Sequence, residues 1–530
     1  MKKLFVLVTL ALTYTSIYAQ APDTVFTRCY GGSLIECNGL TGLNNLGFAT
    51  LSADIGSDSS VFIVTSSLSS DGYVNKNNGD EDIWVLKLNP QGDTLWTKVF
   101  GGSQTERSGK ILALPDGGCI ITGRTFSNDG DFTNAQFGVL NDAVVIRLDA
   151  NGSLVWKKRL GGSQDDLLHA IALNGNGFIA VGETGSVDGD LDASLAGYTC
   201  GWIVSLNANG DLLWSIKTNG VIQNEDYIQS FWNVAKATDG SGWYAIGITG
   251  DFADPDSDDI LFTKFDNNGS VVNKTAFGSN KGDGIGGIAV LPSGNLIMAG
   301  RASNATGGQT YIGGAADAWL VTVDVTTGLP ITQKLIGGTE WESFYDVKTN
   351  TLGEVFALGF TRSTNNFAST TAFGLMDSWL VKLTPGLDTV YTSRLGGNDN
   401  DVGMALCKNA SALYAVGRTN SNNGAVSGNN GTRDVWVIKY AHTETGVSVT
   451  EGVTEKVNVY PNPTNGIVNI VLSNTTQRIS LYSQTGQLVA TVNGNQTGPT
   501  QIDATNLAQG VYMLWVQTAE CTYRQKLIVH

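Results

Sequence analysis

The stretch Asp82-Ile83-Trp84-Val85-Leu86-Lys87-Leu88 decides the fold, because it recurs along the chain. The other six copies, some of them weaker, begin at Asp142, Cys200, Asp259, Asp317, Asp377 and Asp434. Successive copies start 57 to 60 residues apart. A fixed period of this length indicates a repeat architecture, in which one structural unit is built several times.

Each unit contains four short runs of β-type residues. In the second unit they span residues 110–114, 119–123, 143–148 and 154–160. The runs are strand-length, are separated by turn residues and show no helical period. Asn-Gly pairs such as Asn151-Gly152 stand between the third and fourth runs, where a tight hairpin needs two residues with positive φ. Four antiparallel strands per repeat predict one blade of a β-propeller.

The two ends of the repeat region predict how the ring closes. The last unit has no fourth run after Tyr440, whereas residues 24–32 align without a gap with residues 94–102, a fourth run and its Gly-Gly turn. An N-terminal strand that completes the last blade would also cover edges that otherwise promote aggregation. The sequence therefore predicts an all-β, seven-bladed β-propeller over residues 20–440, with four-stranded blades and the N-terminal strand closing the last one.

The units resemble the SBBP-type β-propeller repeat. The matching pattern is clearest at residues 142–149, at Gly152 and at residues 161–166, and the resemblance extends over about residues 24–440. It departs from the pattern at Cys200, where an aspartate is expected. Copies vary in every repeat family, so this departure leaves the predicted blade count unchanged.

Composition and the N-terminus restrict the partners and the location. The chain has 66 Gly, only 15% charged residues and a net charge of −16, which repels phosphate backbones and argues against a nucleic-acid partner. Residues 1–19 combine Lys2 and Lys3, an apolar run over 4–12 and a small residue at Ala19. This pattern predicts a secretory signal peptide, and its apolar run is too short to span a bilayer. We expect an exported mature chain without a transmembrane span.

The C-terminal part of the chain carries a different pattern. Residues 441–456 lack the period and are predicted to be a linker, and the alternating runs that begin at Val457 predict a small β-sandwich over residues 457–530. This segment is similar to the type A C-terminal sorting domain of type IX secretion cargo. The motif residues that carry the similarity are Tyr460, Pro461, Asn462, Pro463, Gly510 and Tyr512.

The resemblance implies a route and two kinds of partner. A sorting domain of this family implies passage across a Gram-negative outer membrane by the type IX secretion machinery. It also implies removal of the domain by a sortase-like peptidase, followed by release or attachment to the outer cell surface. The alternative is an ordinary accessory β-sandwich. In neither case does the domain define the activity of the propeller.

Residues suited to catalysis or to metal binding are scarce. The six cysteines form no Cys-x-x-Cys pair, which argues against a zinc site, and a disulfide between Cys29 and Cys37 stays open. His169 is the only histidine within the repeats and has no nucleophile motif beside it. We therefore expect no enzyme, no catalytic residues, no metal site and no cofactor. The acidic loops at residues 188–192 and 254–258 keep calcium open as an alternative.

Each unit also places one acidic residue just after its Gly-Gly turn or a degenerate copy of that turn. These repeated acids are Glu36, Glu106, Asp166, Glu225, Asp283, Glu342 and Asp401. An active site needs carboxyl groups in different environments, whereas a residue repeated in every blade more often serves the fold. We expect these carboxylates to accept backbone N–H bonds in the turn or to pair with a neighbouring arginine. Ligand or cation binding and catalysis are the alternatives.

Two functions from different classes follow from the long loops between the second and third runs. These loops share a face of a propeller with the acidic turns and place aromatic residues among polar ones, as glycan- and protein-binding loops do. The predicted ligand contacts are Phe126, Tyr198, Trp232 and Phe367. The favoured function is a secreted or cell-surface scaffold for binding or adhesion, with an unknown glycan or protein ligand. The alternative is a secreted carbohydrate-active enzyme that uses loop carboxylates.

Overall fold

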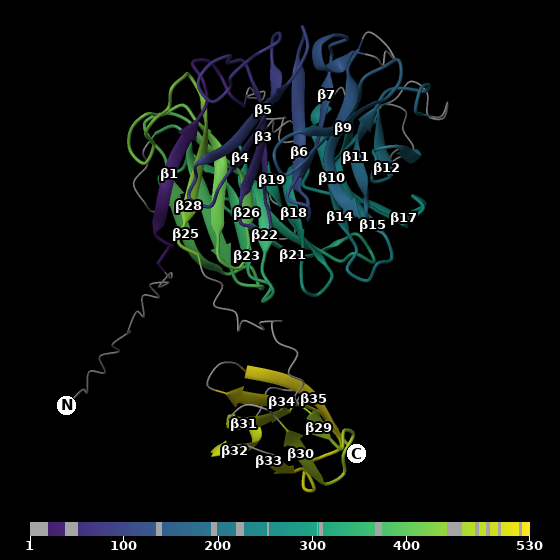
Figure 1. The fold of residues 1–530 in the computed structure, drawn as a ribbon, viewed down its shortest axis with the longest axis vertical. Coiled ribbons are helices and arrows are strands. Elements are labelled where there is room, and N and C mark those ends of the chain that lie inside the picture. Colours follow the sequence, from purple (N-terminus) through teal and green to yellow (C-terminus); the bar gives the residue numbers. More distant parts are fainter. Residues whose placement is uncertain are drawn as a thin grey trace, which may run out of the picture. The chain divides into compact units, whose positions relative to one another are not determined.

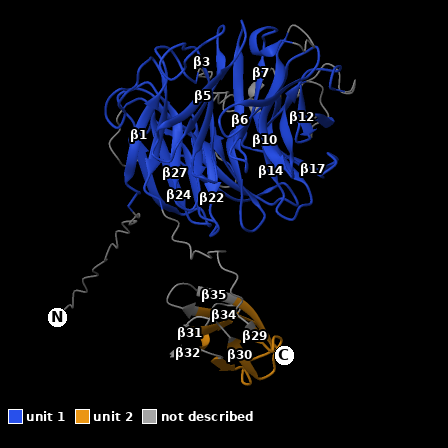
Figure 2. Ribbon diagram, in the orientation of Figure 1, with its two compact units in different colours: residues 1–444 blue, residues 445–530 orange. Residues whose placement is uncertain are grey.

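The structure is a computed structural model that divides into two compact units, residues 1–444 and residues 445–530 (Figure 2). The predicted signal peptide, residues 1–19, and most of the predicted linker lie outside the described residues. The described residues are 20–37, 51–133, 140–191, 199–218, 227–251, 254–304, 306, 311–365, 374–442, 458–471, 476–483, 488–496, 500–518 and 522–530.

The described part of the first unit forms seven four-stranded antiparallel sheets (Figure 1). Their first strands are β2 (Leu51–Ile55), β6 (Glu106–Ala113), β10 (Asp166–Asn174), β14 (Tyr227–Lys236), β18 (Gly284–Val290), β22 (Glu342–Thr349) and β26 (Asp401–Lys408). Their second strands are β3 (Val61–Ser67), β7 (Cys119–Thr125), β11 (Gly177–Thr184), β15 (Trp243–Asp251), β19 (Leu296–Ala302), β23 (Val355–Thr361) and β27 (Leu413–Thr419).

The third and fourth strands complete the sheets. The third strands are β4 (Asp82–Leu88), β8 (Asp142–Leu148), β12 (Cys200–Leu206), β16 (Asp254–Phe265), β20 (Asp317–Val323), β24 (Asp377–Leu383) and β28 (Asp434–Tyr440). The fourth strands are β5 (Thr94–Phe100), β9 (Leu154–Leu160), β13 (Leu212–Thr218), β17 (Val271–Phe277), β21 (Pro330–Ile336), β25 (Thr389–Leu395) and, for the sheet that contains β28, the N-terminal β1 (Thr24–Tyr30). One short 3-10 turn, η2 (Gly130–Phe132), interrupts this pattern.

The first strands line the centre of a closed ring. Each contacts the first strand of the next sheet, from β2 to β6 and onward to β26, and β26 contacts β2. Apolar residues fill the space between each pair of adjacent sheets, including the last and the first. The repeated tryptophan supplies much of this core, since Trp84, Trp319 and Trp436 are each 1% exposed. The repeated motif is therefore buried on both faces of its strand.

The N-terminal strand completes the sheet made by the end of the propeller. β1 pairs antiparallel with β28, with Tyr30 opposite Val435 and Cys29 opposite Trp436, and Figure 1 shows the purple β1 beside the green β28. Tyr30 is 2% exposed, and its hydroxyl donates to the carbonyl oxygen of Gly92 in the first sheet. The prediction of an all-β propeller closed by the N-terminal strand is confirmed.

The second unit is a small two-sheet domain. One sheet contains β29 (Asn458–Tyr460), β30 (Ile467–Val471) and β33 (Thr500–Asp503). The other contains β31 (Thr476–Ser483), β32 (Leu488–Gln496), β34 (Gly510–Thr518) and β35 (Thr522–Val529). Residues from both sheets share one apolar core, as expected for a β-sandwich.

Two features of the described residues bear on the class of protein. None of their helices is long and apolar enough to cross a membrane. The described cysteines are buried, and Cys29 and Cys37 form no disulfide with each other in this structure.

The pairing of β1 with β28 predicts that the N-terminal strand holds the ring together. Deleting residues 20–30 should lower the melting temperature or cause aggregation, because it exposes the edge of β28. Tyr30→Ala alone should cost roughly 3–5 kcal/mol, the range for large buried aromatic residues.

The matched control is Val25→Ala in the same strand, because Val25 is 57% exposed. Thermal unfolding of the three variants checks this. Equal melting temperatures for the deletion and the wild type would contradict the closure.

Candidate functional site

The turn carboxylates, which we define as Glu36, Glu106, Asp166, Asp283, Glu342 and Asp401, each sit at the start of a blade. Glu106 shows the arrangement. Its Oε2 accepts a hydrogen bond from the Gly102 amide at 2.8 Å, and its Oε1 accepts bonds from the Thr125 hydroxyl at 2.6 Å and the Ser127 amide at 3.3 Å. The side chain is fully buried. This carboxylate therefore ties the Gly-Gly turn to the end of the second strand of its own blade.

The same network recurs around the ring. Glu342 and Asp401 accept bonds from the amides of Gly338 and Gly397, at 2.8 and 2.6 Å. Hydroxyl-bearing residues at the end of the second strand complete the network, as Thr361 does for Glu342. Burial raises the pKa of Glu36 to about 7 and that of Asp283 to about 6. Glu225, the seventh predicted acid, lies outside the described residues.

A Gly-Gly-Ser turn with several amides pointing one way could in principle bind an anion. In the turn after β5 the protein fills that role itself. The amides of Gly102, Ser103 and Gln104 donate to Glu106, Asp129 and the Ser127 hydroxyl. The turn is therefore a joint between strands. A Thr-x-Ser sequence whose threonine ends the second strand, such as residues 125–127, is the sequence signal for this network, which was not predicted.

The aromatic residues predicted to contact a ligand lie in different environments. Phe126 is half-buried, and its carbonyl oxygen accepts a bond from the Gln104 side chain. Trp232 lies within β14, is 6% exposed and donates to the Ser230 hydroxyl, so it is a core residue and is not exposed for a ligand. Residue 232 belongs to the first strand of its blade, which places it in the packed layer. Tyr198 and Phe367 lie outside the described residues.

Several of the described residues weighed for metal binding or catalysis are used by the fold. Asp188 and Asp190 accept bonds from the amides of Ser163 and Gly161. The described residues contain no group of three or more His, Cys, Asp or Glu side chains that could hold a metal ion. His169 is half-buried, and desolvation lowers its pKa to about 3, which keeps the imidazole neutral.

A small cavity lies in the centre of the ring, among the first strands of six blades. It measures about 160 Å³, and its charged lining residues are Asp54, Lys110, Asp346 and Lys348. The two aspartates bridge neighbouring blades, since Asp54 accepts the Ala113 amide at 2.9 Å and Asp346 the Leu406 amide at 2.8 Å. Ligand pockets usually exceed 300 Å³, so this cavity suits water molecules better than an organic ligand.

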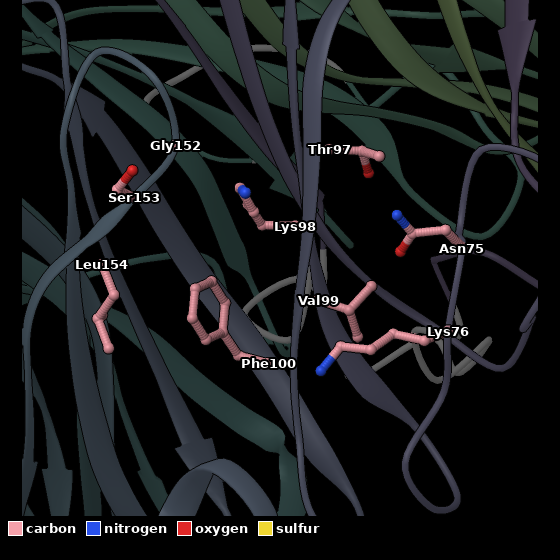
Figure 3. Close-up of a pocket in the computed structure, with 9 residues that line it drawn as sticks. All are labelled: Asn75, Lys76, Thr97, Lys98, Val99, Phe100, Gly152, Ser153 and Leu154. Carbon is pink, nitrogen blue, oxygen red and sulfur yellow. The ribbon is translucent and has the colours of Figure 1, made fainter.

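A larger hollow, the outer groove, lies at the outer edge of the first two blades and measures about 360 Å³. Its lining residues are Asn75, Lys76, Thr97, Lys98, Val99, Phe100, Gly152, Ser153 and Leu154. Figure 3 shows Lys98 and Phe100 on the side of β5 that faces the Gly152–Leu154 segment. Thr97 and Val99 face Asn75 and Lys76 instead. Because two blades and a loop form the groove together, no single repeat in the sequence revealed it.

The charge of the outer groove is opposite in sign to the net charge of the chain. The protein carries a net charge of −16, yet the groove is lined by two lysines and by no carboxylate. Lys76 is half-exposed and lies 3.8 Å from Asp131. Ion pairs of this exposed kind contribute little to stability, so the ammonium group is available to another anion.

The predicted sorting motif is part of the second unit's framework. The Asn462 side chain donates to the Lys526 carbonyl oxygen at 2.6 Å and accepts the Ile528 amide at 3.0 Å. Tyr512 is 8% exposed, and its hydroxyl donates to the Ala508 carbonyl oxygen. The motif residues therefore fix the opening loop to the closing strand and pin the start of β34.

The turn network predicts a cost for losing one of its carboxylates. Glu342→Ala leaves the donors of Gly338, Thr361 and Ser363 without an acceptor in a buried place. Each unpaired donor costs about 1–3 kcal/mol, so the free energy of unfolding should fall by several kcal/mol. Glu340→Ala in the same turn is the control, because Glu340 is exposed. Denaturant titration checks this, and equal stability of the two variants would contradict the structural role.

Comparisons with known proteins agree with the division into units. Residues 458–530 match the family described as "Secretion system C-terminal sorting domain". Regulatory protein FlaEY of Caulobacter vibrioides is 27% identical over 164 residues, which are 29% of this chain and 17% of that protein's length. The chain therefore spans less than one fifth of this curated relative.

Solved structures provide further likenesses at low identity. PorZ, a surface component of the type IX secretion system of Porphyromonas gingivalis, has a TM-score of 0.40 and 12% identity, with 90% of this chain and 59% of that chain covered. The Pan2 WD40 domain of Neurospora crassa has a TM-score of 0.42 and 10% identity, with 80% and 99% covered. A polysaccharide lyase of family PL25 has a TM-score of 0.48 and 11% identity, with 79% and 96% covered.

The family match identifies the second unit. Its position at the C-terminus and its span agree with the predicted sorting segment. The chain is thus a β-propeller protein that carries a type IX secretion sorting domain, which directs it to the cell surface or into the medium.

Proposed function

We propose that this protein is an exported binding propeller that holds an acidic ligand, of the class of carboxylated or sulfated polysaccharides, in the outer groove. The observation that carries the proposal is the pair of lysines in a groove without carboxylates, on a chain that is otherwise strongly acidic. The groove also has the size of a typical ligand site.

The groove offers the groups that such a ligand needs. Lys76 and Lys98 supply ammonium donors for carboxylate or sulfate oxygens. The Asn75 amide and the Ser153 hydroxyl add neutral hydrogen-bonding groups. Leu154, which is 46% exposed, adds apolar surface for the face of a sugar ring. Negative charges more than about 8 Å away act weakly on the groove at physiological salt, because their field is screened. Asp131, 3.8 Å from Lys76, competes with the ligand for that lysine.

A carbohydrate-active enzyme that uses loop carboxylates is the alternative proposal. It requires acids that reach a substrate. The described turn carboxylates are buried and already accept hydrogen bonds from their own turns, which favours the binding proposal. The predicted ligand face with Phe126, Tyr198 and Phe367 stays a prediction, and it would bind a ligand elsewhere on the same unit.

The groove predicts a charge-dependent interaction. Lys98→Glu should weaken binding to a sulfated polysaccharide by tenfold or more, because it replaces a donor cation with a repelling anion. Raising the salt concentration should weaken binding by the wild type as well. Isothermal titration with the sulfated polymer and its desulfated form measures both effects.

Lys281→Glu is the matched control, because Lys281 is exposed and belongs to another blade. It should bind like the wild type, and all variants should melt alike. Equal binding by Lys98→Glu and Lys281→Glu would contradict the groove as the site. Conversion of the polymer into shorter products would favour the enzyme.

The sorting domain predicts a defined defect in export. Deleting residues 458–530 should retain the propeller in the periplasm, because the export machinery no longer recognises it. Cell fractionation and mass spectrometry of the medium and cell surface check this. A full-length exported protein that still ends at His530 would argue against removal of the domain by a peptidase.

A further inference from the structure

Two buried carboxyl groups face each other at the junctions between blades. One is a turn carboxylate, and the other is the aspartate that begins the third strand of the preceding blade. If Gly337 carried a Cβ atom, that atom would lie 2.7 Å from the Oδ1 atom of Asp317 and 2.7 Å from the Oε2 atom of Glu342. The two oxygens are therefore at most twice that distance apart. The same holds at Gly31 for Asp434 and Glu36, at 2.4 Å each.

The hydrogen bonds around the Asp317–Glu342 pair leave one oxygen without a donor. Both side chains are fully buried. The Oδ2 atom of Asp317 accepts the Ile312 amide at 2.7 Å, whereas its Oδ1 atom, on the side of Glu342, accepts no hydrogen bond from the described residues. A buried anionic oxygen without a donor is costly, and a second carboxylate beside it raises the cost further.

In two other blades an arginine pairs with the Oδ2 atom of the aspartate and offsets its charge. Arg394 lies 2.6 Å from Asp377, and Arg159 pairs with Asp142. Arg394 stands opposite Trp379 in its sheet. The equivalent position opposite Trp319 is held by Leu335, and that opposite Trp436 is held by Cys29. The pairs Asp317–Glu342 and Glu36–Asp434 thus lack the cation that their counterparts have.

A bound metal ion fits these pairs poorly. Calcium takes six to eight oxygen ligands, and no described group of three or more His, Cys, Asp or Glu residues could hold a metal ion. The backbone of Gly337 also stands against both oxygens. A proton needs no space for further ligands. It converts one of the two neighbouring carboxylates from a hydrogen-bond acceptor into a donor.

We propose that two blade junctions without an arginine, those of Asp317–Glu342 and Glu36–Asp434, each hold one proton shared between their two carboxyl groups. Each pair of carboxyl groups then carries a single negative charge, and the carboxylate oxygen that has no other donor takes part in a hydrogen bond. In support, burial and the smaller effect of the neighbouring charge raise the pKa of Asp317 to about 6. Burial and the charge of Asp434 likewise raise the pKa of Glu36 to about 7.

No other described charged group near the two pairs offsets their negative charge in place of the proton. The Tyr311 phenol is the further titratable group that faces Asp317 and Glu342, and no described Lys, Arg or His forms an ion pair with either. Near Glu36 and Asp434, the Cys29 thiol is buried and neutral. The guanidinium of Arg433, which precedes Asp434 in the chain, donates to the Asn420 side chain and the Cys37 carbonyl oxygen.

The sign of the pH effect follows from the raised pKa values. A carboxyl group with a raised pKa in the folded state binds a proton on folding. The stabilisation of the folded state by this proton is complete below the pKa of the unfolded chain, near 4, and is lost as the pH rises through 6 to 7. The propeller should therefore become less stable between about pH 4 and pH 7, in the range where many proteins gain stability.

The test is Asp317→Asn, which places an amide N–H toward Glu342 while the amide oxygen keeps the bond from Ile312. We expect the wild type to melt lower at pH 8 than at pH 5, and Asp317→Asn to melt higher than the wild type at pH 8 by on the order of 2 °C. Asp377→Asn is the matched control. It should melt lower than the wild type at both pH values, because Arg394 loses its partner.

An infrared carbonyl band of a buried protonated carboxyl group gives a second readout. We expect it in the folded wild type at pH 7 and expect it to be weaker in Asp317→Asn. Absence of the band, or a loss of stability in Asp317→Asn at pH 8, would overturn the proposal. So would a rise in the wild-type melting temperature with calcium at pH 8 that Asp317→Asn lacks, since the pair would then be a cation site.

Discussion

The pairing of β1 with β28 is the constraint on which the rest of the propeller depends. Among the described sheets of the propeller, the other six are each built from four consecutive strands, and only this one joins the two ends of the repeat region. The apolar cores between adjacent sheets form a closed series because the last sheet also packs on the first. Without β1 that last sheet would present the edge of β28, so a single strand removes an edge that could pair with another chain.

The carboxylates at the blade junctions are the second recurring device. Each turn carboxylate binds its own Gly-Gly turn to the end of a second strand, so the polar groups of a tight corner find partners inside one blade. A repeated network of this kind lets the surrounding loops vary without disturbing the ring. The network also explains why the turn carboxylates, whose repetition in the sequence could suggest a catalytic set, are inaccessible to a substrate.

The fold could be predicted from the sequence because the repeat controls it. The period placed most third strands at their observed first residue, for example Asp82 and Asp434, and the alignment of residues 24–32 predicted the exchanged strand. The hydrogen-bonding role of the turn carboxylates also followed from their repetition. Each of these inferences used a signal that recurs in every blade.

The candidate site was much less predictable, because it depends on contacts between repeats. Trp232 looked like a loop residue, yet it belongs to a first strand whose register shifts between Phe231 and Asn233. The outer groove combines residues from two blades and one loop, and no spacing in the sequence brings them together. Asp54 carries no signal in the sequence, and only the structure shows that it accepts the Ala113 amide of the next blade.

The exchanged strand also makes the propeller sensitive to whether its chain is complete. β1 precedes the other described strands of its unit in the chain and β28 follows them, so the ring stays open until residue 440 has been made. Contacts between such distant segments form late, after the local hairpins. A chain cut short before β28 would keep an unpaired strand at one end and an uncovered core at the other. Proteases could then distinguish unfinished chains from finished ones, because only a complete chain hides both.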